Sequence, residues 1–312
     1  MSYNRIAVYG HRGWASSAIF NALVSSGAPT KLIYRPGSDV SNIPSNVAKV
    51  ELDIEKQQRE LIAALKNIDI VISLVGHEGV KRQHGFVKAI PHTNVKLFVP
   101  SDLGFRPSDE RGWSVPVNKT KREVEEAAKA AGIPTAVVMV GAFAESTFAI
   151  GILGVDYPGN RIVLTGDSAN QQLNICSRKY VAAAYASIFA RTPPAQLAGR
   201  AIGLSEFKAT GSEIVAALKK KYGAEPQVIR HSLEKVTNEV DTCIQNGIPL
   251  SLAWDCRRAW ANGTIVKGVG DDIWEVEGYK KATLDDLLVG GQLGPYRDLP
   301  PQVVQAFNST FN

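Results

Sequence analysis

The sequence has few cysteines, and their placement excludes two classes of protein. The 312 residues contain three cysteines, Cys176, Cys243 and Cys256, an odd number with wide gaps between them. No two of them have the spacing of metal ligands, and a disulfide framework needs an even number at short intervals. We therefore expect buried free thiols, no disulfide framework and no metal site.

Long apolar runs and a strong excess of one charge are also missing. No stretch reaches 18 consecutive apolar residues, and no charged and apolar signal region precedes the first predicted strand. Lysine and arginine number 35 against 30 acidic residues, a formal net charge of +5. This balance is too weak to predict a nucleic-acid surface, but it allows a basic pocket for an anionic ligand. We expect a cytoplasmic protein with no membrane or nucleic-acid partner.

The first half of the chain alternates short apolar runs with helical periodicity, which predicts an α/β fold. Strands are expected at 5–9, 31–34, 48–51, 69–75, 95–99 and 135–140, and helices at 15–26, 57–66, 79–90 and 117–131. Such alternation is typical of a doubly wound parallel sheet with helices on both faces. Ligands of these sheets bind at the carboxyl ends of the strands.

After Gly141 the alternation loosens. Turn-rich stretches, a predicted hairpin around 161–164 and helices at 210–222 and 232–246 do not form a second regular sheet. We expect residues 1–150 to form the large domain. Residues 151–312 would form a smaller α+β region over its crevice, with some segments packing back on the first domain.

The stretch "RIAVYGHRGWASSAIFNALVSSG" predicts a strand, a tight turn and a helix. Gly10 and Gly13 have the spacing of a dinucleotide-binding turn, in which the backbone approaches the pyrophosphate at the helix N-terminus. Ser16 stands where a third glycine is usual, and its hydroxyl could cap the helix or touch a phosphate. The alternative is a plain strand-to-helix turn without a ligand.

Two arginines favour a cofactor with a 2′-phosphate. NAD-specific enzymes end the second strand with an acidic residue, whereas Arg35 occupies this place here. Arg12, inside the glycine turn, could bind the same phosphate from the other side. Alternatively, both arginines are solvated surface residues. Asp53, after the third strand, lies near the expected adenine region or caps a turn.

Several motifs in the first 145 residues resemble the NmrA-like and isoflavone reductase-like family of atypical short-chain dehydrogenases. They are "LDIEKQQRELIAALKNIDIVIS", "KLFVPSDLGFRPS" and "NKTKREVEEAAKAAGIPTAVVMVGAF". The resemblance implies an NADP(H)-binding Rossmann domain, a small C-terminal substrate domain and NADPH as the cofactor. By motif it implies a catalytic and cofactor-binding lysine, Lys121, and places Pro100, Ser101, Gly104 and Phe143 around the nicotinamide and the substrate. With the glycine turn and the arginines, Trp14 and Val75 complete the expected cofactor-binding set.

Lys121 is the candidate for chemistry, because hydride transfer leaves negative charge that a cation or a proton donor must stabilise. Lys119 lies about 200° away on a helix and faces elsewhere. The Y-x-x-x-K pair of ordinary short-chain dehydrogenases is missing, since position 117 is Val117. His77 could contact the substrate with Phe143, and His84 ranks below it. For both histidines a hydrogen-bonded structural role is the alternative.

Two departures from the family pattern leave two functions open. Ser16 replaces a glycine, and "SRKY" at 177–180 lacks the acidic residue often found before the helix that follows the hairpin. The first hypothesis is an NADPH-dependent reductase of a small aromatic or secondary-metabolite-like substrate. The second is a non-catalytic NADP-binding sensor that acts through a protein partner. In either case the chain could form a homodimer.

Overall fold

A five-stranded parallel sheet organises the first half of the molecule. The computed structural model describes residues 2–311. The strand order is β3-β2-β1-β4-β5, with β1 (Ile6–Tyr9) at the centre between β2 (Thr30–Tyr34) and β4 (Ile70–Ser73). The outer strands are β3 (Ala48–Glu51) and β5 (Leu97–Val99). From β1 the strands are added outward to β3, and the chain then returns to place β4 and β5 on the other side of β1. Open α/β sheets form their ligand crevice where the strand order reverses in this way.

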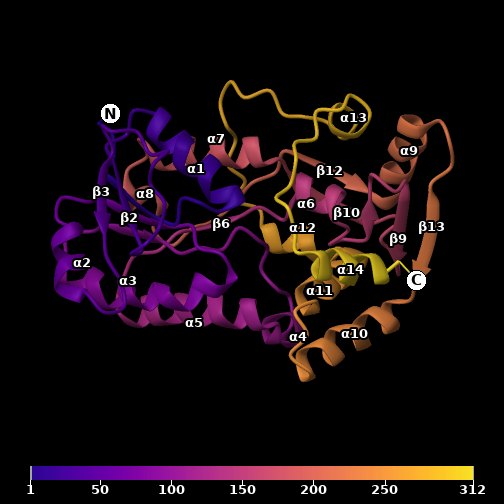
Figure 1. Ribbon diagram of the computed structural model, residues 1–312, viewed down its shortest axis with the longest axis horizontal. Helices are drawn as coiled ribbons and strands as arrows, with labels where there is room; N and C mark the ends of the chain where they lie inside the picture. The colour runs from indigo at the N-terminus through magenta and orange to yellow at the C-terminus, as the bar shows by residue number, and fades with distance from the viewer. Residues whose placement is uncertain (1, 312) are drawn as a thin grey trace.

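Helices cover both faces of this sheet. Alternate side chains of β1 point to opposite faces, so Ile6 and Val8 belong to one core and Ala7 and Tyr9 to the other. The first core is closed by α1 (Trp14–Ser25) and α7 (Arg178–Phe189), and the second by α2 (Gln58–Ala64), α3 (His84–Ala89) and α5 (Pro116–Ala130). In Figure 1, α5 runs below the sheet while α1 and α7 lie above it. The predicted doubly wound α/β fold is confirmed.

The helix expected at 79–90 is only partly correct. Residues His77–Gln83 form a 3₁₀ helix (η1), α3 follows, and a second short 3₁₀ turn (η2) spans Ile90–His92. The segment packs tightly: a Cβ added at Gly79 would lie 2.7 Å from Val75 Cβ, and one at Gly85 would lie 2.2 Å from the Ile54 carbonyl oxygen. Periodicity finds the buried face of such a segment but not its tighter winding.

The second half both extends the large sheet and builds a separate lobe. β6 (Val137–Met139) pairs with β11 (Ala201–Gly203), and a bridge between Phe98 and Thr135 joins this pair to β5. Figure 1 places the separate lobe beside the first. Its strands are β7 (Ala142–Phe143), β8 (Val155–Asp156), β9 (Arg161–Thr165), β10 (Gln172–Cys176), β12 (Phe207–Thr210) and β13 (Gln227–His231). The limits at residue 150 stay a prediction, since nothing in the sheet pairing divides the chain there.

The other helices connect or cover these strands. They are α4 (Glu110–Ser114), α6 (Ala144–Ala149), α8 (Pro194–Leu197), α9 (Gly211–Tyr222), α10 (Leu233–Gln245), α11 (Ser251–Ala261), α12 (Thr264–Val269), α13 (Leu284–Leu288) and α14 (Pro301–Ser309). The segment after α12 arches over the top of the molecule to α13 and then returns toward α14 (Figure 1). Within residues 2–311, no helix is both long and apolar enough to cross a bilayer.

Candidate functional site

A cavity of about 1040 Å³ opens at the carboxyl ends of the parallel strands. One end is formed by the residues that follow β1, β2 and β4, and the other by the second half of the chain. The predicted site residues that line it are Gly10, Arg12, Gly13, Trp14, Arg35, Val75, His77, Ser101, Gly104, Lys121 and Phe143. Pro100 is buried beside it, whereas Asp53, His84 and Lys119 do not line it.

The glycine turn lies between β1 and α1. Gly10 has a φ of +92°, and a Cβ there would be 2.8 Å from the Leu74 carbonyl oxygen, so only glycine fits. Gly13 has an ordinary φ of −66° and is exposed at the N-terminus of α1, where no side chain caps the helix. The first amides of α1 are therefore free to bind an anion.

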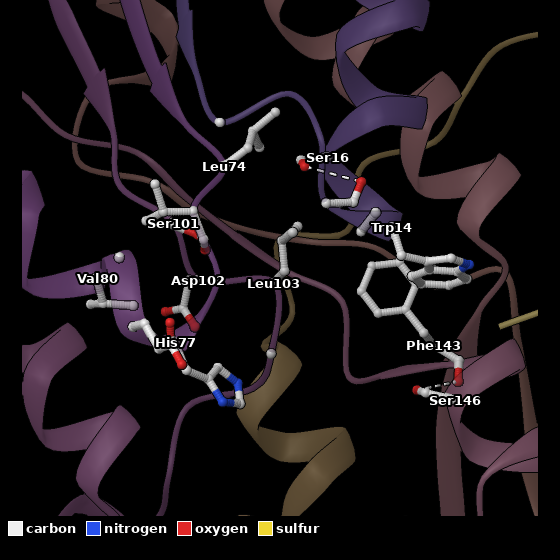
Figure 2. Close-up of a pocket in the computed structure, with 18 of the residues that line it drawn as sticks. Trp14, Ser16, Leu74, His77, Val80, Ser101, Asp102, Leu103, Phe143 and Ser146 are labelled. Carbon is white, nitrogen blue, oxygen red and sulfur yellow. Dashed lines mark hydrogen bonds between the residues drawn. The ribbon is translucent and has the colours of Figure 1, made fainter. Parts of the chain in front are cut away.

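The Ser16 side chain packs against the glycine turn. It is buried, and its hydroxyl donates to the Gly13 carbonyl oxygen at 3.2 Å. A Cβ at Gly13 would lie 2.7 Å from Ser16 Oγ, so the hydroxyl occupies the space next to the glycine (Figure 2). Gly13 is the N-cap of α1 and no side chain caps the helix, so the capping role considered for Ser16 is wrong, while its contact with a phosphate stays a prediction.

Three arginines lie at the first end of the cavity. Arg35 follows β2 in a tight turn in which Ser38 N donates to the Arg35 carbonyl oxygen at 3.1 Å and Gly37 has a φ of +73°. Arg12 comes from the glycine turn, and Arg82 from η1. The sequence analysis did not single out Arg82, because a lone arginine on a helix is ordinarily a surface residue.

Ser101 ties the ends of β4 and β5 together. Its hydroxyl donates to the Val75 carbonyl oxygen at 2.7 Å, and its amide donates to Gln83 Oε1 at 2.8 Å. Gln83 is fully buried and also donates to the Val80 carbonyl oxygen. The serine of the "VPSDLG" motif therefore shapes the wall of the cavity in addition to facing it.

Lys121 is held by an acidic partner. Its Nζ donates to the Asp102 carbonyl oxygen at 2.7 Å and to Asp102 Oδ1 at 2.8 Å. The two side chains are 17% and 15% exposed, and both line the cavity. Since an ammonium has three N–H groups, one remains for a ligand. Asp102 was missed, although it directly follows Ser101 in the motif.

The loop under this ion pair is fixed on both sides. Leu103 has a φ of +53°, which a branched side chain rarely adopts. The Gly104 carbonyl oxygen accepts hydrogen bonds from the amides of Val140 and Gly141 at 2.8 and 2.9 Å. A Cβ at Gly104 would be 3.6 Å from Lys121 Nζ, so glycine keeps the space beside the ammonium open.

An aromatic group forms one wall of the cavity. The rings of Trp14 and Phe143 meet edge to face with centroids 5.3 Å apart, and Tyr296 lies 4.8 Å from Trp14. Trp14 Nε1 donates to the Pro295 carbonyl oxygen at 3.0 Å, which ties the returning C-terminal segment to the glycine turn. Figure 2 shows Trp14 and Phe143 on the side of the cavity opposite Asp102 and His77. Nothing in the sequence indicated that residues near 296 reach the turn near 14.

His77 stands opposite, at the open side of the cavity. Partial removal from water lowers the pKa of its imidazole, and the positive charges of Lys121 and Arg297 lower it further. A neutral imidazole can both donate and accept a hydrogen bond. Its placement in the cavity fits the contact expected for it, and the contact itself stays a prediction.

The end of the cavity formed by the second half of the chain is largely apolar and contains one buried hydroxyl without a partner. Ile152, Leu153, Leu252 and Ile265 line it. Thr147 is fully buried, and its hydroxyl has no hydrogen-bond partner among the described residues. Cys256 also lies here, and burial raises the pKa of its thiol to about 12, so it is no nucleophile.

Comparison with known proteins places the chain in a family. The NmrA-like family model matches residues 2–257. The chain belongs to the NmrA-like family. A bifunctional pinoresinol-lariciresinol reductase of Thuja plicata is 32% identical in an alignment of 187 positions, and the match covers 53% of this chain and 58% of that protein. The NmrA-like chain thus spans a little over half the length of this curated relative.

Solved structures show the same fold over nearly the whole chain. One, from a study of pinoresinol-lariciresinol and phenylcoumaran benzylic ether reductases, has a TM-score of 0.75 at 22% identity and covers 92% of this chain and 98% of its own. The binary complex of leucoanthocyanidin reductase with NADPH from Vitis vinifera has a TM-score of 0.70 at 17% identity, covering 98% and 99%. The resemblance to the NmrA-like and isoflavone reductase-like proteins is confirmed.

The departure at "SRKY" has a structural explanation in this NmrA-like protein. Ser177 caps α7 by accepting a hydrogen bond from the Tyr180 amide at 3.1 Å. Glu206 accepts from the Ser177 amide and Glu145 from the Arg178 amide, so carboxylates from two other segments neutralise this helix end. Glu206 and Glu145, which are distant in sequence, therefore take the place of the missing acidic residue at this helix end.

The tryptophans of the second half pack the structure and do not line the cavity. Trp254 and Trp260 are buried, and Trp260 Nε1 donates to the Gln171 carbonyl oxygen at 2.9 Å. Trp274 Nε1 donates to Ser187 Oγ at 3.0 Å. Trp274 packs against the core that α1 and α7 close.

Proposed function

We propose that this protein is an NADPH-dependent reductase of a small, largely apolar substrate of the aromatic or secondary-metabolite type. The observation that carries the proposal is Lys121, whose ammonium is fixed by Asp102 beside the cavity with one N–H left over. The similar proteins are named as reductases, and one structural neighbour was solved with NADPH, which supports the same activity here.

The residues at the first end of the cavity fit a dinucleotide phosphate. Gly10 lets the turn approach Leu74 closely, and the uncapped N-terminus of α1 offers amides to the pyrophosphate. Arg12 and Arg35 would hold the 2′-phosphate, since neither side chain has an ion pair or hydrogen bond within residues 2–311. Val75, Pro100, Ser101 and Phe143 would surround the nicotinamide.

NADPH, when bound, would supply the hydride. Lys121 would then stabilise negative charge on the substrate oxygen through its free N–H, or give it a proton. The clamp by Asp102 favours this over a mobile lysine, because a donor that is already oriented needs no reorganisation when charge develops. The wall formed by Trp14, Phe143 and Tyr296 offers a surface on which an aromatic ring can stack.

The test combines calorimetry with turnover. Wild-type protein should bind NADPH and oxidise it with at least one member of a panel of aryl ketones, enones and phenylpropanoid ethers, followed by NADPH absorbance. Lys121→Met should keep NADPH affinity within about threefold and lower turnover by roughly 10² to 10⁴. Lys119→Met is the matched control, since this exposed neighbour does not line the cavity and should turn over normally.

The outcomes separate the two functions left open by the sequence. Turnover by Lys121→Met at the wild-type rate contradicts the catalytic assignment. Tight NADPH binding without oxidation across the whole panel favours the NADP-binding sensor with a protein partner. A homodimer and a cytoplasmic location stay predictions that this experiment does not address.

A further inference from the structure

The hydroxyl of Tyr9 is a buried polar group without a partner in the structure. Tyr9 ends β1, is 3% exposed, and lines the cavity directly before the glycine turn. Its ring packs edge to face on Phe86 at a centroid distance of 5.5 Å, but its oxygen has no hydrogen bond within the described residues. A buried hydroxyl left unpaired costs about 1–3 kcal/mol, so such groups ordinarily have a partner.

Charged groups surround this hydroxyl. Burial raises the pKa of Tyr9, the guanidinium groups of Arg35 and Arg82 act against this rise, and the carboxylates of Asp53 and Glu55 add to it. Both arginines line the cavity, and neither carboxylate does. The cations near the phenol therefore also face the cavity, where an anionic ligand can reach them.

The acidic neighbours are themselves engaged. Glu55 pairs with Arg82 at 3.2 Å, and Asp53 Oδ1 accepts a hydrogen bond from the Glu55 amide at 3.0 Å. A guanidinium has five N–H donors, so Arg82 can keep Glu55 and still bind an anion in the cavity. The ion pair with Glu55 therefore leaves N–H donors of Arg82 available for an anion.

We propose that Tyr9 and Arg82 join Arg12 and Arg35 in binding the adenosine 2′-phosphate, and thereby set the preference for NADP(H) over NAD(H). This inference rests on the proposed function only in taking NADP(H) as the ligand. A phosphate oxygen accepts the hydrogen bond that the Tyr9 hydroxyl has to donate, and Arg82 supplies a charge opposite Arg35. The three guanidinium groups and the phenol would together hold the phosphate.

The experiment is calorimetric titration of the full chain with NADP⁺ and, separately, with NAD⁺. Tyr9→Phe removes only the hydroxyl and should weaken NADP⁺ about tenfold or more while leaving NAD⁺ within twofold. Arg82→Gln should do the same, and Lys81→Gln, at an exposed neighbour that does not line the cavity, should change neither. The melting temperature of Tyr9→Phe without cofactor should not fall, because no hydrogen bond within the protein is lost.

Each other outcome overturns a stated part. If Tyr9→Phe binds NADP⁺ as wild type does, or loses NAD⁺ affinity equally, the hydroxyl does not read the 2′-phosphate. A drop of several degrees in its melting temperature would mean that the hydroxyl has a protein partner. If wild type binds neither dinucleotide, the cofactor assignment fails and this inference fails with it. Wild-type binding with unaffected variants leaves the proposed function intact and refutes this inference alone.

Discussion

The two ends of the cavity are built from different kinds of structure. The first end consists of residues that directly follow parallel strands, such as Gly10 after β1 and Arg35 after β2. The other end combines α6, α11, α12 and the returning segment at Tyr296, which are distant in sequence. Position in the first end follows from local chain geometry, whereas position in the second depends on how the lobes pack. The first end is therefore predictable from motifs, and the second is not.

Within the first end, substitutions of Gly10 and Gly13 should separate loss of cofactor binding from loss of stability. Gly13→Val should weaken NADPH binding by about 100-fold or more, because a branched side chain would fill the phosphate space. The exposed position at φ −66° accepts the side chain once the Ser16 hydroxyl, 2.7 Å from the new Cβ, rotates away. Gly10→Ala should instead lower the free energy of unfolding by about 2 kcal/mol or more, because φ is +92° and Leu74 blocks the Cβ.

Calorimetry and urea unfolding of both variants check this division. A Gly13→Val protein that binds NADPH normally would show that the turn holds no phosphate. A Gly10→Ala protein as stable as wild type would show that the contact with Leu74 is easily relieved.

Asp102 lies where the two ends meet, and its replacement tests how much the clamp contributes. Asp102→Asn keeps an oxygen acceptor and the backbone carbonyl but removes the charge opposite Lys121. We expect kcat to fall about 10- to 100-fold and NADPH affinity to stay within twofold, since the orienting charge acts on the substrate step. An unchanged kcat would mean that the backbone carbonyl alone positions Lys121.

The first end could be predicted well from the sequence, because residues that directly follow parallel strands lie at the same edge of the sheet. All six strands expected in the first half formed, and the motif residues Ser101, Gly104 and Lys121 came together beside the cavity. Arg297 and Tyr296 could not be predicted, since no pattern near residue 296 shows that its segment crosses to Trp14. Thr147 could not be predicted either, since Phe143 ends β7 and no helix was expected at 144–149, where α6 forms.

Thr147, at the other end of the cavity, offers a test that needs no known substrate. Thr147→Val keeps the shape of the side chain and removes a buried hydroxyl without a partner among residues 2–311. We expect stability to rise by about 1 kcal/mol, seen as a melting temperature roughly 2 °C higher. Ser146→Ala is the matched control and should slightly lower stability, because Ser146 Oγ donates to the Phe143 carbonyl oxygen. A lower melting temperature for Thr147→Val would mean that this hydroxyl is satisfied inside the protein.

An effect of similar size and opposite sign is expected where α4 of the first half meets α11 of the second. Asp109 caps α4 by accepting from the Gly112 amide at 2.9 Å, and it also accepts from Arg258 Nη1 and Nη2 of α11 at 2.6 and 2.9 Å. The hydrogen bonds from Arg258 are the main reason that the pKa of Asp109 is lowered from 3.8 to about 2. A carboxylate with a lowered pKa stabilises the fold above its unfolded-state pKa and loses that contribution as the pH falls through the folded-state value.

Asp109→Asn keeps the helix cap and removes the charge, so it isolates the contact between the halves. The lowered pKa corresponds to about 2 kcal/mol, which we reduce to about 1 kcal/mol because the Asp109 side chain is 44% exposed and solvent screens it. At pH 7 the variant should be less stable by this amount in urea unfolding, and the difference should vanish as the pH falls from about 4 to about 2. Asp241→Asn is the control, because its pair with Arg111 also joins α4 to the second half but is exposed on both sides and should matter little. Equal effects of the two substitutions would mean that Asp109 contributes no more to the contact between the halves than an exposed surface charge does.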